Sequence, residues 1–188
     1  ASRKLQISDN GIGMTAEEAE SNLGMIARSG TQAFLDSLKS GGGTSAPDMI
    51  GQFGVGFYAA FMVASTVTVD TLRRGADQTA VRWQSDGKDG YTIGASDRAT
   101  PGTTITLDIM PEHEHLIEEW QLKSLVKRYS DFIAYPIRLA VDGKEIDPDS
   151  EPLNTMRALW RRDKSGIKPE EYAEFYKHLT HDFSDPLR

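Results

Sequence analysis

Two glycine-rich stretches about forty residues apart constrain this chain more than any other feature. The first, "SDNGIGM", follows an alternating apolar run and places Gly11 and Gly13 directly after Asp9. The second, "GQFGVGF", spans residues 51–57. Glycine leaves the main chain uncovered, so a ligand can approach it closely. A flexible segment rich in glycine, residues 40–47, lies between them. We interpret this arrangement as a pocket for a flat base, a mobile lid and a phosphate cradle.

Asp9 stands where the first predicted strand ends, and two roles are open to it. Aspartate is common in turns, where it caps the main chain, and the residue alone favours that role. Beside two glycines, however, a buried carboxylate would suit an exocyclic amine such as N6 of adenine. The residues leave both interpretations open.

The second stretch does not match the best-known nucleotide motifs. Its G-x-x-G-x-G spacing is the reverse of the dinucleotide fingerprint and does not follow a strand. It also lacks the Lys-Ser/Thr pair of a P-loop. We expect it to lead into a helix over residues 57–63, part of a buried apolar run at 55–64, whose N-terminal amides attract phosphate.

The remaining pattern predicts an α/β fold with a largely antiparallel sheet. Thr15 and Glu18 form a capping box for a helix that Gly24 ends. A long helix is expected at 114–134 and a strand at 136–141, and the three tryptophans are interpreted as packing residues. A first strand is expected at residues 4–8. Four further β-rich runs separated by turns cover 65–72, 79–85, 91–95 and 103–110. Such a series is typical of an antiparallel meander.

Composition excludes several classes of protein. A formal net charge of −7 over 188 residues argues against nucleic acid as the main partner. The absence of cysteine excludes disulfides and thiolate metal sites and fits a reducing compartment. No apolar run approaches the ~20 residues that a membrane span needs. We therefore expect a cytoplasmic protein with no membrane and no nucleic-acid partner.

The motifs resemble those of the heat shock protein 90 chaperones, in particular the bacterial HtpG-like form. The resemblance is carried by "DNGIGM", "NLGMIARSGTQAF" and "MIGQFGVGFYAAFMVA", and the tail "EEYAEFYKHLTHDFSDPL" is similar to the start of that family's middle domain. These chaperones are GHKL ATPases with a Bergerat-type fold, which implies an α+β two-layer sandwich with helices on one face of the sheet.

The resemblance also implies a site for ATP or ADP with Mg²⁺. Asp9 and Thr103 would contact the adenine, Gly13 and Met14 would line its pocket, and the lid would span about 24–54. The other implied ATP-binding residues border the sugar and phosphates or belong to the lid and cradle: Asn22, Leu23, Arg28, Ser29, Gly30, Gly51, Gln52, Phe53, Gly54, Val55, Gly56 and Phe57.

By the same resemblance, residues 1–147 would be the N-terminal nucleotide-binding domain, 148–154 a linker and 155–188 the start of the middle domain. The general-base glutamate and the Mg²⁺-holding asparagine of the family would lie upstream, on a helix that this chain does not include. We therefore expect no catalytic residue in this chain, weak nucleotide binding at best and no meaningful hydrolysis.

The implied function is ATP-dependent chaperoning of unfolded or partly folded client proteins, with the parent protein a homodimer through a C-terminal domain absent here. Two alternatives remain from the sequence. One is another GHKL ATPase of the sensor-kinase or topoisomerase type. The other is a non-catalytic interaction module in which the glycines are structural.

Overall fold

A computed structural model describes residues 3–25, 54–75, 79–141, 143–156, 166–180 and 184. The chain divides into two compact units, Ala1–Ile117 and Glu118–Arg188. Most of the predicted lid lies outside the described residues. No helix within the described ranges is long and apolar enough to cross a membrane.

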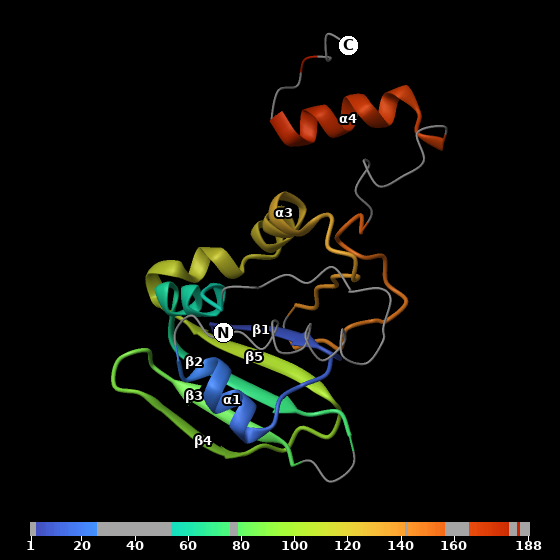
Figure 1. The fold of residues 1–188 in the computed structure, drawn as a ribbon. Helices are drawn as coiled ribbons and strands as arrows, with labels where there is room; N and C mark the ends of the chain where they lie inside the picture. The colour runs from blue at the N-terminus through green and yellow to red at the C-terminus, as the bar shows by residue number, and fades with distance from the viewer. Residues whose placement is uncertain are drawn as a thin grey trace. The chain divides into compact units, whose positions relative to one another are not determined.

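The first unit is built on a five-stranded antiparallel sheet in the order β1-β5-β2-β3-β4 (Figure 1). The strands are β1 Lys4–Asp9, β2 Ala64–Leu72, β3 Val81–Ser85, β4 Tyr91–Ala95 and β5 Gly102–Ile109. The predicted β-runs are confirmed to within two residues at each end. The predicted meander is right only for β2, β3 and β4.

The last strand of the sheet, β5, lies between β1 and β2 instead of beside β4. Thr103 therefore faces Asp9 on one side and Thr71 on the other. The strand carries the buried residues Leu107 and Ile109, whereas every residue of β4 is exposed. An apolar strand buries more of its side chains in the centre of a sheet than at an edge, and is therefore more stable there. Its local sequence pattern does not reveal which strands will be its neighbours.

Helices cover one face of this sheet, as the α/β prediction requires. The capping box of α1 (Ala16–Leu23) is confirmed: the Thr15 hydroxyl accepts from the Glu18 N–H at 3.2 Å, and the Glu18 carboxylate accepts from the Thr15 N–H at 2.9 Å. The core packs side chains of α1 against those of the sheet and comprises Ala19, Leu23, Ala64, Val67, Val69, Trp83, Leu107 and Ile109.

The predicted buried helix after the second glycine stretch is instead a 3₁₀ helix, η1 (Gly56–Met62), and none of its residues is fully buried. Phe57 and Phe61 pack against the core, while Met62 is 73% exposed. The prediction of a buried element was wrong, because this short helix presents only one side to the sheet.

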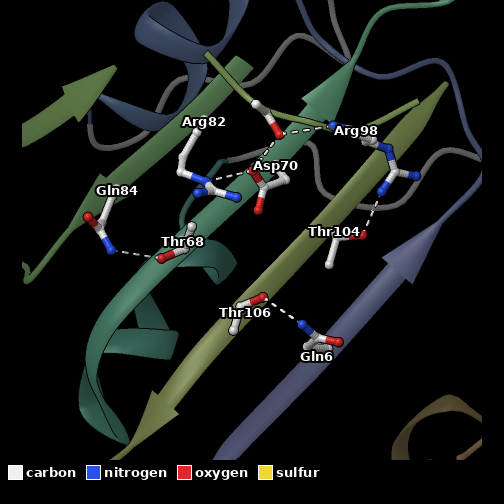
Figure 2. Close-up of polar contacts among 9 residues, drawn as sticks. Gln6, Thr68, Asp70, Arg82, Gln84, Arg98, Thr104 and Thr106 are labelled. Atoms are coloured by element: carbon white, nitrogen blue, oxygen red, sulfur yellow. Dashed lines mark hydrogen bonds and ion pairs between the residues drawn. The ribbon is translucent and has the colours of Figure 1, made fainter. Parts of the chain in front are cut away.

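The opposite face of the sheet is polar, and hydrogen bonds between its side chains join neighbouring strands (Figure 2). Ser8 pairs with Thr104 at 2.7 Å, and Gln6 donates to Thr106 at 3.3 Å. Side chains alternate between the two faces of a strand, so these residues sit opposite the apolar core.

The predicted helix over 114–134 is wrong as a single element. A 3₁₀ helix, η2 (Pro111–Ile117), ends the first unit, and α3 (Glu119–Ser130) begins the second. Glu118 between them is extended, with φ −64° and ψ 137°. Trp120 on α3 is 66% exposed, which contradicts its predicted packing role, whereas Trp83 is buried as predicted. Trp160 lies outside the described residues.

The predicted strand at 136–141 does not form in the described part of the chain. The Asn154 side chain accepts from the N–H group of Ile137 that a neighbouring strand would use. The Asn154 amide accepts from the Ile137 N–H at 2.8 Å and donates to the carbonyls of Ile133 and Tyr135, each at 2.9 Å. Asn154 is 4% exposed. The last residues of the predicted linker, 153–154, are thus fastened to the chain that follows α3.

Asp131 holds the next residues in the same way. Its carboxylate accepts from the Thr155 N–H at 2.9 Å, from the Thr155 hydroxyl at 2.6 Å and from the Lys127 ammonium at 3.1 Å. Burial raises the pKa of this carboxyl, but the bonds from Thr155 and Lys127 lower it by more, so the pKa lies below its ordinary value. The last described helix of this unit is α4 (Pro169–Thr180).

We expect Asp131→Asn to lower the free energy of unfolding by about 1–3 kcal/mol at pH 7, because an amide offers one acceptor oxygen where the carboxylate offers two. A carboxyl whose pKa is depressed by folding stabilises at neutral pH and loses that effect as the pH falls through its folded-state pKa. The difference between variant and parent should therefore shrink below about pH 4.

Urea unfolding followed by circular dichroism between pH 2 and 7 measures this effect. Asp149→Asn is the matched control, since the Asp149 side chain is exposed and makes no hydrogen bond with a described residue. An equal loss in both variants at pH 7 would contradict the role given to Asp131.

Candidate functional site

The first glycine turn begins with a bond from its own aspartate. One carboxylate oxygen of Asp9, Oδ1, accepts from the Gly11 N–H at 2.8 Å and from the Thr103 N–H at 3.3 Å. The capping role is thus confirmed. Asp9 is exposed, not buried as predicted, and its Oδ2 makes no hydrogen bond with any described residue. The carboxylate therefore keeps one oxygen available to a ligand while the other fixes the turn.

The same turn is pressed against the end of β2. Gly13 has φ +66°, and a Cβ placed on it would overlap the Leu72 carbonyl oxygen. The Arg74 N–H donates to the Ile12 carbonyl at 2.8 Å, and the Met14 N–H donates to the Thr71 hydroxyl at 2.9 Å. Only glycine combines this backbone conformation with this close approach.

Two threonines in contact, Thr71 buried and Thr103 half-buried, lie beside the turn. The Thr71 hydroxyl donates to the Gly102 carbonyl at 3.2 Å and lies 3.1 Å from the hydroxyl oxygen of Thr103. Thr71 is fully buried. Our sequence analysis named Thr103 and missed Thr71. A signal for it was present, because Thr71 continues the alternation of Val67 and Val69 and so places a hydroxyl on the core face.

The helix after the turn, α1, carries two further predicted residues. Leu23 is a core residue, and its carbonyl accepts from the Tyr58 hydroxyl at 3.0 Å. Asn22 is half-buried. The bond from Tyr58 joins the end of α1 to η1, so the structure brings the elements that follow the two glycine stretches into contact.

In the described part of the second glycine stretch, Val55 and Gly56 are exposed while Gly54 is half-buried. Gly54 has φ +63°, Val55 is 54% exposed, and a Cβ on Gly56 would meet no atom within 4 Å. Phe57 turns inward instead, with its ring 5.6 Å from those of Tyr58 and Trp83. The remaining predicted site residues lie outside the described part of the chain: Arg28, Ser29, Gly30, Gly51, Gln52 and Phe53.

A carboxylate with a depressed pKa lies on the polar face near the turn. Burial raises the pKa of Asp70, but hydrogen bonds from Arg82 and Ser96 and the charges of Arg82 and Arg98 lower it by more. Asp70 contacts Arg82 at 2.8 Å and Ser96 at 2.6 Å (Figure 2). Within the described ranges, no three acidic or histidine side chains gather as a metal site would require.

Two family models match the sequence, one over its N-terminal part and one over its C-terminal part. Residues 1–92 match the model described as histidine kinase-, DNA gyrase B-, and HSP90-like ATPase, and residues 142–188 match the model described as Hsp90 protein. The five-stranded antiparallel sheet with helices on one face agrees with the GHKL ATPase fold.

Curated relatives extend these matches over nearly the whole chain. Chaperone protein HtpG of Geobacter sulfurreducens is 47% identical over 98% of this chain and 31% of its own length. The proteins of the same name from Photorhabdus laumondii and Gluconobacter oxydans are 47% and 44% identical over 98% of this chain, which spans 30% and 29% of their lengths. The chain belongs to the heat shock protein 90 family of GHKL ATPases.

We expect Gly13→Ala to lower the free energy of unfolding by about 2 kcal/mol or more, because the new methyl group would meet the Leu72 carbonyl in a strained backbone conformation. Gly56→Ala is the matched control from the other glycine stretch, since its Cβ enters open space. It should change stability by less than about 0.5 kcal/mol. Thermal unfolding of both variants measures the difference, and equal melting temperatures would contradict the packing described for Gly13.

Proposed function

We propose that this chain is the nucleotide-binding part of an ATP-dependent chaperone. The observation that carries the proposal is the Asp9 carboxylate, whose Oδ1 is bound to main-chain N–H groups while Oδ2 has no partner among the described residues. A carboxylate oriented in this way can accept a hydrogen bond from an exocyclic amine beside the uncovered main chain of Gly11.

Adenine would be held by Asp9 and Thr103, with Gly13 and Met14 beside it. The open main chain at Gly56 and the positive φ of Gly54 support a role in holding phosphate. The proposed contacts of Asn22 and Leu23 with the sugar and phosphates rest on the family resemblance, as do the places of Val55 and Phe57 in the cradle. The side chains of Leu23 and Phe57 pack inward, so neither side chain would make such a contact. The proposed roles of residues 28–30 and 51–53 rest on the same resemblance.

Mg²⁺ would neutralise phosphate charge when bound with the nucleotide. Because the relatives are named as chaperones, we also propose unfolded client proteins as partners, a homodimeric parent protein and a cytoplasmic location. The domain boundaries near residues 147 and 155 remain part of this proposal. The rival of another GHKL enzyme is not favoured, because the relatives found over nearly the whole chain are HtpG chaperones.

Asp9→Asn tests the proposal, and we expect it to weaken ADP binding about 10- to 100-fold, the effect of losing a hydrogen bond to a charged group. An asparagine keeps an oxygen that can accept from Gly11 and Thr103, so the turn should persist. Calorimetric titration with ADP and Mg²⁺ measures the affinity, and thermal unfolding checks the fold.

Asp86→Asn is the matched control. Asp86 also caps a turn, accepting from the Lys88 N–H at 3.0 Å. It is exposed and lies far from the glycine turn in the sequence. It should leave ADP affinity unchanged. If the parent chain binds no ADP, or if Asp9→Asn binds as well as Asp86→Asn, the glycine stretches are structural and the interaction-module alternative gains support.

A further inference from the structure

Arginine side chains converge on the main chain of the first glycine turn, and none of them is used in the proposed function. Arg98, from the loop between β4 and β5, donates from Nη2 to the Asp9 carbonyl at 2.9 Å. Two arginines that follow β2 make longer bonds of 3.3 Å to other carbonyls of the turn, Arg73 to Gly13 and Arg74 to Asn10.

Arg98 is the arginine most completely committed to this region. Its Nε donates to the Thr100 carbonyl at 2.9 Å. Its Nη1 donates to the Thr104 hydroxyl at 2.5 Å, as Figure 2 shows. With the bond to Asp9, all three guanidinium nitrogens are engaged, and every acceptor is neutral. The side chain is half-buried and pairs with no carboxylate among the described residues. A planar group with donors in fixed directions defines the positions of its acceptors more closely than a lysine would.

The loop is shaped to allow this approach. Gly102 has φ +123°, and a Cβ on it would overlap the Asp9 carbonyl oxygen and lie 2.8 Å from Nη2 of Arg98. Any other residue at this position would displace one of the two bonded groups. Gly102 leaves room at the Asp9 carbonyl, and Arg98 donates to that carbonyl.

The contact bears on the carboxylate because both ends of Asp9 are then fixed. Arg98 holds the main-chain carbonyl, while the Gly11 and Thr103 N–H groups hold Oδ1. The direction of Oδ2 follows from these bonds. Without Arg98 the Asp9 carbonyl loses this donor, and the carboxylate would sample other directions.

We propose that Arg98 is a positioning residue that aims the Asp9 carboxylate and thereby sets both the affinity and the base selectivity of the site for adenine nucleotides. This inference rests on the proposed function. It assigns no contact between Arg98 and the nucleotide. Selectivity depends on direction because guanine carries a carbonyl oxygen where adenine carries its exocyclic amine, and a carboxylate aimed at that place repels the oxygen.

The test compares Arg98→Met with Arg98→Lys and with a control, Arg138→Met. Arg138 is also half-buried and also donates to a main-chain carbonyl, that of Ser150, at 3.0 Å, but it lies in the second unit. Calorimetric titration with ADP and with GDP, each with Mg²⁺, gives two affinities for each protein. Amide hydrogen exchange at Gly11 and Thr103 reports on the bonds to Oδ1 without any nucleotide.

For Arg98→Met we expect ADP affinity to fall about tenfold, the effect of a carboxylate that holds the binding direction about a tenth of the time. The ratio of ADP to GDP affinity should fall with it, and the Gly11 and Thr103 amides should exchange faster. Arg98→Lys should recover part of each effect. Arg138→Met should leave all three readouts at the parent values even if it lowers the melting temperature.

Three results would overturn the inference, and they differ from one another. If the parent chain binds no ADP, the proposed function fails and the inference falls with it. If the parent binds ADP and Arg98→Met binds it equally well, only the positioning role fails. If Arg98→Met loses affinity for ADP and GDP equally and the two amides exchange at the parent rate, Arg98 is merely structural.

Discussion

The hydroxyl group of Thr71 joins three segments that lie far apart in the sequence. It accepts from the Met14 N–H, donates to the Gly102 carbonyl and contacts the Thr103 hydroxyl. It is fully buried at the end of a strand whose other inward residues are valines. A buried hydroxyl must find partners within the protein. The first glycine turn, β2 and β5 therefore reach their positions together, and the candidate site exists only once they have done so.

Close approach of main chain to main chain is the second constraint on the site. Gly13 meets the Leu72 carbonyl and Gly102 meets the Asp9 carbonyl, both with positive φ. These contacts leave the turn little freedom, and the side chains of Arg73, Arg74 and Arg98 restrict it further. A turn that is held before a ligand arrives loses less conformational entropy on binding. The rigid side of the site thus consists of strands β1, β2 and β5 and the turn between β1 and α1.

Local signals predicted local structure well. The Thr15–Glu18 capping box appears with both of its bonds, because both partners lie within one helical turn. β4 has the predicted bounds, since its ends are marked by turns. The predicted helix at 114–134 failed at Glu118, whose extended backbone no local residue signals. The predicted strand at 136–141 failed because Asn154, seventeen residues after Ile137, takes the N–H group that a neighbouring strand would have used.

The sequence by itself determined the class of the chain, because the motifs that resemble those of the heat shock protein 90 chaperones are read directly from the residues and agree with the family matches. It also determined that Asp9 caps or binds, without deciding between the two. The tertiary structure showed that one oxygen of this carboxylate caps the turn while the other has no partner among the described residues, so the two roles do not exclude each other. It alone placed β5 beside β1 and brought Thr71 and Arg98 to the turn. Strand order and long-range hydrogen bonds depend on residues that approach only when the chain folds, and no local pattern encodes them.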